Sequence, residues 1–198
     1  MELIIKPKPV GMANCIYNVY ENEILIYKGV VNTTNLLWPK KVTLYGADGK
    51  EICYAKQENI LNFIMECMPI INLFSFSSCP FIYYKDNENV GKVKNKYSYI
   101  YCTFNKEEYK LASPNINVKY IYNSKKQIGK TQRTKINKYF DSFFYRVMFN
   151  SNVSRELMIM LFIISEVIWE GDNLNYNTFE YTKKSTNKKY DDNWTPDE

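Results

Sequence analysis

An apolar run of thirteen residues, 157–169, lies near the C-terminal end of the chain and is interrupted only by Ser165 and Glu166. A helix over this run would have no polar side, so other parts of the protein must cover it almost completely. At a rise of about 1.5 Å per residue the helix would be roughly 20 Å long, and a membrane-spanning helix needs ~20 apolar residues. The run therefore predicts a buried helix, over about 154–170, inside a structure that can surround it.

The chain before this helix has the pattern of short β-strands joined by tight turns. Eighteen Tyr and eleven Phe against seven Gly and seven Pro favour strands. Three segments share one pattern: an aromatic or apolar strand end, a polar turn, then Ile or Val, a small residue and a Lys. These segments are 44–56, 82–94 and 120–132, and 16–27 is a weaker copy. Each is predicted to be a β-hairpin, because Asp, Asn and Gly supply the positive φ of tight turns.

We expect further strands at 97–104, 108–112 and 142–149, so that the hairpins form a meander. A meander hides its edges by closing into a barrel or by folding into a sandwich. Residues 57–79 leave two structures open. Their apolar positions have helical spacing up to Pro69, whereas 70–76 could form a strand.

Polar residues mark the ends and the interior of the predicted helix. Ser151, Asn152 and Ser154 are all possible N-caps, and Gly171 is a plausible C-terminal stop. Ser165 can return its hydroxyl to the carbonyl of residue 161 within the helix. Glu166 is different, because an unpaired buried carboxylate costs several kcal/mol. We expect it to reach the barrel mouth or to meet a Lys or Arg.

The composition excludes several kinds of active site. The chain has no His, which removes the usual general base and the commonest metal ligand. Its five cysteines are scattered without a CxxC pair, which argues against a disulfide framework or a zinc site. The Gly129-Lys130-Thr131 triplet is not a phosphate-binding loop, because Ser124 stands where that motif needs Gly. We expect a protein without catalytic activity, cofactor or metal.

The chain divides into three parts. Residues 1–12 are expected to be an N-terminal extension without a signal peptide, which favours a cytoplasmic protein. Residues 13–171 form the predicted domain, and 172–198 form a polar tail that is expected to be partly disordered. The tail carries six acids and four lysines, whereas 1–171 carry 22 basic and 15 acidic residues. A basic domain with an acidic tail is compatible with an anionic partner.

The repeated hairpins followed by one apolar terminal helix resemble the tubby C-terminal-like superfamily, which includes tubby domains, phospholipid scramblases and LURP-one-related proteins. The resemblance rests on Asn-Cys-Ile-Tyr at 14–17, on the three hairpin segments and on 155–164. It implies a bacterial member with a closed antiparallel β-barrel of about 10–12 strands enclosing the hydrophobic C-terminal helix. It also implies lipid recognition, because tubby domains bind phosphoinositide head groups and scramblases move phospholipids. The chain lacks the cysteine cluster and the Pro-rich arm of scramblase-like sequences.

A basic stretch at 115–140 contains no acid and provides the candidate binding residues. If 120–122 and 128–136 pair as a hairpin, the side chain of Lys130 lies on one face of the sheet and those of Arg133 and Lys135 lie on the other. Three or four of these charges could form a phosphate-binding patch. The alternative is a solvated rim whose lysines discourage edge pairing. The candidates for anion or lipid binding are Lys119, Lys125, Lys126, Lys130, Arg133 and Lys135.

Two functions follow as hypotheses. The first is a binding module that recognises anionic phospholipid head groups, cytoplasmic and peripheral to the membrane, without a transmembrane segment. The second is a cytosolic regulatory or immunity-type protein whose partner is another polypeptide. A nucleic-acid partner is not expected, because the aromatic residues alternate with aliphatic ones along strands and are assigned to packing.

Overall fold

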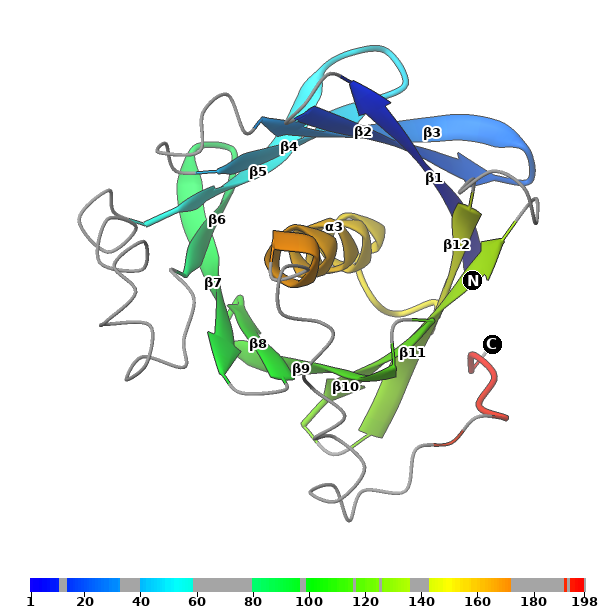
Figure 1. The fold of residues 1–198 in the computed structure, drawn as a ribbon. Coiled ribbons are helices and arrows are strands. Elements are labelled where there is room, and N and C mark those ends of the chain that lie inside the picture. Colours follow the sequence, from blue (N-terminus) through cyan, green and yellow to red (C-terminus); the bar gives the residue numbers. More distant parts are fainter. Residues whose placement is uncertain are drawn as a thin grey trace.

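The computed structural model describes residues 1–10, 14–32, 40–58, 80–96, 99–115, 117–124, 126–135, 143–171, 191 and 193–197. In these residues twelve antiparallel strands close into a barrel around one helix (Figure 1). The elements are β1 (Glu2–Val10), β2 (Asn14–Glu21), β3 (Ile24–Asn32), β4 (Lys41–Gly46), β5 (Glu51–Gln57), β6 (Phe81–Lys85), β7 (Glu88–Lys96), β8 (Tyr99–Phe104), β9 (Glu107–Asn115), β10 (Val118–Asn123), β11 (Lys126–Lys135), β12 (Phe143–Phe149) and α3 (Arg155–Gly171).

Each strand pairs with its neighbours in the sequence, and β1 pairs with β12 to close the sheet. The predicted barrel of 10–12 strands around a C-terminal helix is therefore confirmed, and the sandwich is excluded. All four predicted hairpins are present, as β2–β3, β4–β5, β6–β7 and β10–β11. The prediction for 57–79 falls almost wholly on residues outside the described ranges, which end at Glu58 and resume at Pro80.

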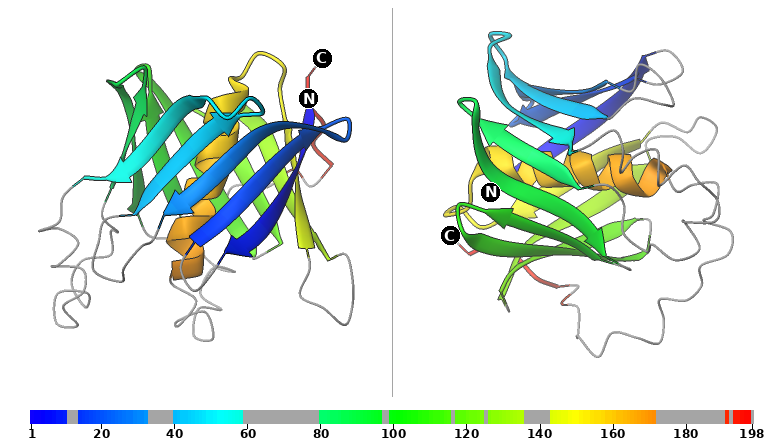
Figure 2. Two further views of the ribbon diagram at one scale, coloured as in Figure 1. Left: turned by 90° about the horizontal axis from the view of Figure 1, so that it is seen from above. Right: turned by 90° about the vertical axis from the view of Figure 1, so that its left-hand side faces the viewer.

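The two ends of the barrel differ. At one end, which we call the tight-turn end, four of the five turns between strands have two residues, and β4–β5 is joined by 47–50. Both turn residues have positive φ at 22–23, 86–87 and 105–106. Such turns match the right-handed twist of the paired strands. At the other end, which we call the mouth, β1, β3, β5, β7, β9 and β11 finish. The helix runs along the barrel from the tight-turn end to the mouth (Figure 2).

The expectation of an N-terminal extension over 1–12 needs correction, because residues 2–10 are strand β1 of the barrel. Leu3 and Ile5 are fully buried in the core. Met1 and Phe149 form two backbone hydrogen bonds with each other. Because hydrogen-bonding directions alternate along a strand, the backbone N–H groups of the odd-numbered residues of β1 face β12. The ladder with β12 ends at Ile5. Pro7 and Pro9 have no backbone N–H, but at their positions it would face β12 beyond the end of the pairing. A strand tolerates proline where no hydrogen bond to a neighbouring strand is lost.

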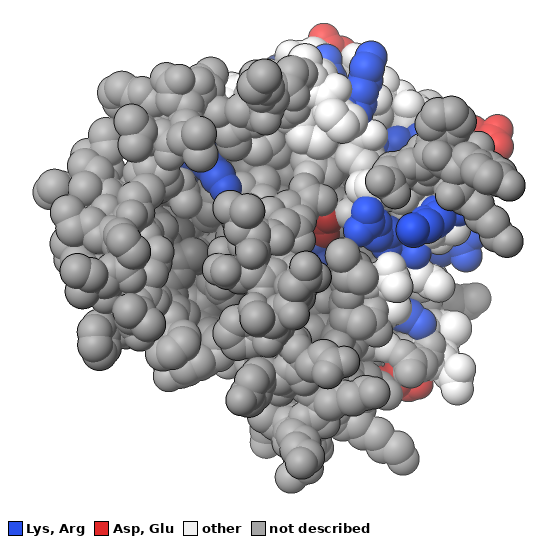
Figure 3. Space-filling view, viewed as in Figure 1, with Lys and Arg blue, Asp and Glu red and all other residues white. Residues whose placement is uncertain are grey.

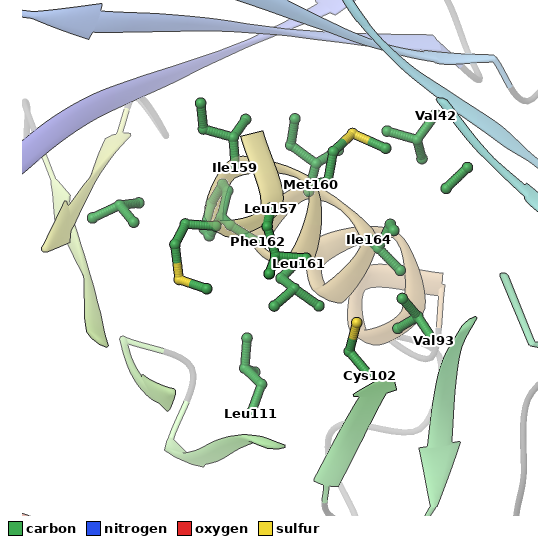
Figure 4. Packing of buried hydrophobic residues seen from close by; sticks show 14 of the residues in the cluster. Val42, Val93, Cys102, Leu111, Leu157, Ile159, Met160, Leu161, Phe162 and Ile164 are labelled. Atoms are coloured by element: carbon green, nitrogen blue, oxygen red, sulfur yellow. The ribbon is translucent and has the colours of Figure 1, made fainter. Parts of the chain in front are cut away.

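The core lies between the helix and the inner face of the wall. Every side chain from Leu157 to Ile168 is buried. Figure 4 shows the helix among wall residues Val42, Val93 and Cys102. Burying a Leu or Ile side chain contributes roughly 1.5–3 kcal/mol relative to exposure, so the helix and the barrel depend on each other. The helix is capped by Ser154, whose hydroxyl accepts a hydrogen bond from the Leu157 amide at 3.3 Å.

The last described residues, 193–197, return to the tight-turn end, where the N-terminus also lies (Figures 1 and 2). Asp197 contacts Lys126 and Asn150 there. This end of the predicted tail is therefore placed against the barrel by specific contacts, although the sequence predicts partial disorder in 172–198.

Candidate functional site

A polar cluster interrupts the apolar core near the mouth. The Lys119 ammonium forms an ion pair with Glu166 and donates a hydrogen bond to the Ser165 hydroxyl at 2.9 Å. The Tyr145 hydroxyl donates to the other carboxylate oxygen of Glu166. The ring of Phe162 lies 5.2 Å from the same ammonium. A charge inside a barrel needs such partners, and the expectation that Glu166 meets a basic side chain is confirmed.

Ser165 fulfils its expected role with a different acceptor. Its hydroxyl donates to the carbonyl of Phe162 at 2.6 Å, three residues earlier in the helix, and not to that of Leu161. The same hydroxyl accepts the hydrogen bond from Lys119. One oxygen therefore connects the helix backbone to the wall of the barrel.

Lys119 does not belong to an exposed basic patch, which corrects its assignment as a surface anion-binding residue. It is 4% exposed and stands directly opposite Thr131, which is 1% exposed, on the inward side of β10 and β11. Inward and outward positions alternate along a strand, and Lys119 falls on the inward side. Its partner is the carboxylate of the protein itself.

The other candidates from the basic stretch lie at separate places along β11. Lys126 is at the tight-turn end, where it forms an ion pair with Asp197. Lys130 pairs with Tyr120 midway along the strand, whereas Arg133 and Lys135 lie at the mouth. Lys125 lies outside the described residues, as does Lys138. The six candidates therefore do not form one surface, although Arg133 and Lys135 remain together.

Arg133 is the most constrained basic residue of the mouth. Its guanidinium carbon lies 3.7 Å from the centre of the Phe143 ring. Its Nε atom is buried and has no hydrogen-bond partner among the described residues. Lys135, two residues further along β11, is exposed. Arginine held over an aromatic ring presents its remaining donors in a fixed plane, which suits a phosphate group.

Charge is segregated along the barrel axis. Glu58 and Glu166 lie at the mouth and both are ion-paired, and Glu170 stands in the last turn of α3 at the same end. The other acidic side chains described in the strands, turns and helix lie toward the tight-turn end, namely Glu2, Glu21, Glu23, Asp48, Glu51, Asp86, Glu88, Glu107, Glu108 and Glu156. Described basic residues of the mouth half are Lys6, Lys8, Lys40, Lys41, Lys56, Lys92, Lys94, Arg133 and Lys135. Figure 3, which looks onto the mouth, shows Lys and Arg side chains gathered over its β11–β12 side.

The buried thiols and phenols are not arranged as reactive groups. Burial raises the pKa of the Cys53 thiol to about 11 and that of the Cys102 thiol to about 12. Burial also raises the pKa of Tyr83, beside Cys53, far above its usual value. These thiols are protonated at neutral pH, and a protonated thiol is a poor nucleophile. In the described part of the chain, no three Cys, Asp or Glu side chains gather as metal ligands.

Two further results concern membrane-spanning helices and similarity to known proteins. In the described residues, no helix is long and apolar enough to cross a membrane. No protein-family model, curated protein or solved structure matches the chain.

Proposed function

We propose that the protein is a non-enzymatic binding module that recognises anionic phospholipid head groups at the cytosolic surface of a membrane, through the mouth of the barrel. The segregation of charge along the barrel axis carries this proposal. Basic residues of the mouth half come from five strands and from Lys40, just before β4, and the acids Glu58 and Glu166 already have basic partners. The resemblance to the tubby C-terminal-like superfamily points to the same class of ligand.

Charge segregation orients the protein as well as attracting it. A Lys or Arg close to an anionic membrane surface contributes about 1 kcal/mol, and the attraction falls off within a Debye length of ~10 Å. The acidic side chains of the tight-turn end lie at the far end of the barrel axis. Lys50, Lys85, Lys106, Lys126 and Arg155 offset part of that acidic charge. An anionic surface therefore attracts the mouth more strongly than the tight-turn end, so the protein approaches mouth first.

Arg133 is the residue that we assign to direct contact with a phosphate group. Its guanidinium is held over Phe143, which fixes the plane in which its terminal nitrogens donate. Lys135 follows on the same side of β11 and is exposed. Arg and Lys side by side would supply a bidentate contact and a point charge to the same head group.

The amino-acid composition between β5 and β6 gives a second argument for binding at a bilayer surface. The Glu58 amide donates to the carbonyl of Pro80 at 2.9 Å, so the chain leaves the barrel and re-enters it at one place. The intervening sequence is rich in Ile, Leu, Met and Phe, and Glu66 is its only charged residue. Binding at a bilayer surface strengthens with both apolar area and attraction to anionic lipid.

The absence of an enzymatic role is part of the proposal. Two observations support it: an apolar helix occupies the barrel, and the described buried thiols are protonated. Neither a cofactor nor a metal is needed to bind a head group by charge.

Charge reversal at the two ends of the barrel tests the proposal. The Lys8→Glu/Lys135→Glu protein changes the mouth, and the Lys50→Glu/Lys106→Glu protein makes the same change in net charge at the tight-turn end. All four lysines are exposed. We expect the wild type to co-sediment with phosphatidylcholine vesicles only when they contain phosphatidylserine or a phosphoinositide. Reversing two mouth charges should weaken this binding about tenfold or more, and salt should weaken it further.

Two results would contradict the proposal. One is a wild-type protein that stays in the supernatant with every anionic vesicle at low salt. The other is an equal loss of binding in both double variants, which would indicate a non-directional effect of net charge. A salt-resistant complex with a polypeptide, without vesicle binding, would favour the alternative of a protein partner.

A further inference from the structure

The C-terminal segment 193–197 is bound to the barrel at a site with defined chemistry. The Asp197 carboxylate lies 2.6 Å from the Lys126 ammonium and 3.2 Å from the side-chain amide nitrogen of Asn150. The Asp197 backbone amide donates to the side-chain oxygen of Asn150 at 3.0 Å. One asparagine therefore contacts both the backbone and the side chain of one aspartate.

Asn150 is held in place to make these contacts. It is 4% exposed, its backbone amide donates to the Ile128 carbonyl, and its own carbonyl accepts from the Val153 amide. It lies between β12 and α3, in the connection at the tight-turn end. A buried amide side chain with both its donor and its acceptor used is a specific recognition element.

We propose that Asn150 and Lys126 form a recognition site for a peptide carboxylate, and that the C-terminal segment of this chain occupies it as a releasable clasp. The helix ends at the mouth, whereas Asp197 lies at the opposite end of the barrel. The clasp thus fixes the far end of the segment that follows α3. This inference is independent of the proposed lipid binding.

The two halves of the site differ in how they respond to the solvent. The Lys126 and Asp197 side chains are 70% and 59% exposed, so salt screens their attraction. The hydrogen bonds to Asn150 involve a buried group and are screened much less. A free anion such as inorganic phosphate can compete for Lys126 and for the Asn150 amide. The clasp is covalently attached and competes at an effective concentration on the order of millimolar, so displacement needs phosphate well above that.

The segment carries its own reporter. Asp191 accepts a hydrogen bond from the Asn193 amide, and its carbonyl accepts one from the Trp194 amide at 3.3 Å. Trp194 is partly buried, three residues before Asp197. Its indole N–H resonance can therefore report whether the segment is bound.

The test uses full-length protein labelled with ¹⁵N-tryptophan, in which Trp194→Phe assigns the indole resonance. We expect Asp197→Asn and Lys126→Ala to move this resonance toward its position in a free peptide of residues 191–198. Phosphate should move the wild-type resonance in the same direction. The control is Asp86→Asn, which removes the same charge from an exposed turn at the same end of the barrel and should leave the resonance in place.

Exchange of the Asp197 amide with solvent gives a second measurement, because this amide donates to Asn150. We expect exchange at least tenfold faster in Asp197→Asn and Lys126→Ala than in the control. Wild-type protein with the resonance at the free-peptide position would overturn the proposal, as would both variants remaining unchanged. Protection that grows with protein concentration would overturn it too, because the occupant would then be a second copy.

Discussion

Lys119 of the barrel wall and Glu166 of the enclosed helix form an ion pair whose side chains are only 5% and 6% exposed. Apolar contacts hold a helix inside a barrel without fixing its rotation or its depth strongly, because many packings of similar side chains have similar energies. The pair of charges, one on β10 and one on α3, allows few other positions of the helix, because any shift of the helix leaves both charges buried and unpaired. We infer that this pair, with Tyr145 and Ser165, sets the position of α3.

Breaking the pair from one side should therefore be costly. Lys119→Met leaves the Glu166 carboxylate in the core without its cation, and we expect it to lower the free energy of unfolding by about 3–5 kcal/mol. The Lys119→Met/Glu166→Leu protein removes both charges and should be close to wild type or more stable. Urea unfolding is measured for the wild type, Lys119→Met, Glu166→Leu and the double variant. A double variant that loses the sum of the two single losses would show that the residues act independently.

A close approach between the wall and the helix gives a second prediction. A Cβ at Gly29 would clash with the terminal methyl group of Ile163, whereas a Cβ at Gly91 would clash with the backbone carbonyl of Thr103. Overpacking of this kind costs roughly 1–3 kcal/mol. Ile163→Val removes the obstructing methyl group and by itself costs about 0.5–1.5 kcal/mol. In the Ile163→Val background, Gly29→Ala should therefore cost much less stability than it does in the wild type.

The same substitution should not rescue Gly91→Ala, because a backbone atom cannot be removed. Thermal unfolding of the single and double variants measures the coupling. Equal rescue of both glycine variants by Ile163→Val would contradict this account.

Glu156, in the first turn of α3, makes stability depend on pH. Burial by itself raises the pKa of this carboxyl, but hydrogen bonds from Ser154, the backbone and Tyr27 outweigh it and hold the pKa below 4.5. A folded-state pKa below the unfolded value stabilises the fold fully above about pH 5, and this contribution is lost as pH falls through the folded-state pKa.

Tyr27→Phe removes one of these hydrogen bonds and should raise the pKa of Glu156. We expect the variant to be less stable than wild type at pH 7, with a difference that shrinks as the pH falls below about 4. Denaturant unfolding at several pH values measures this. Tyr45→Phe is the control, because no hydrogen bond of its hydroxyl is described, and its effect should not change with pH. A constant difference for Tyr27→Phe would contradict the role of Glu156.

The turns and the helix were the predictable parts of the fold. Asn or Asp, which accept positive φ, stands first in each of the turns 22–23, 86–87 and 105–106, so local chemistry favours hairpins there. The helix was predictable because a long apolar run between a cap and a glycine has few other structures open to it. Strand β1 was not, because Pro7 and Pro9 argue against a strand unless the pairing partner is known.

The orientation of Lys119 could not be read from alternation along β10. Tyr120, Ile121 and Tyr122 are all buried, so neither side of this strand has a polar signature. The sequence did contain a signal for the ion pair. A buried Glu166 requires a cation, and Lys119 is a cation among apolar neighbours, as expected of a residue that faces the core. The segregation of charge was also present in the sequence. The acids cluster at every second turn of the meander, and a closed meander brings alternate turns to the same end.

The helix inside the barrel gives the most direct prediction about the fold. Ile164 is completely buried, whereas Ile24 is 67% exposed at the tight-turn end. Ile164→Asp places a carboxylate without a partner in the core, at a cost of several kcal/mol in addition to lost apolar burial. A domain is typically stable by only about 5–15 kcal/mol. We therefore expect Ile164→Asp to abolish soluble folding, and Leu161→Asp to do the same.

Ile24→Asp makes the same chemical change on the surface and should alter the unfolding free energy by no more than about 0.5 kcal/mol. Circular dichroism and the yield of soluble protein distinguish the variants. If the helix instead lay on the outside of the domain as a peripheral anchor, Ile164→Asp would fold normally and lose only binding to vesicles. A folded Ile164→Asp protein with native strand content would therefore contradict the enclosed helix, whatever its affinity for lipid.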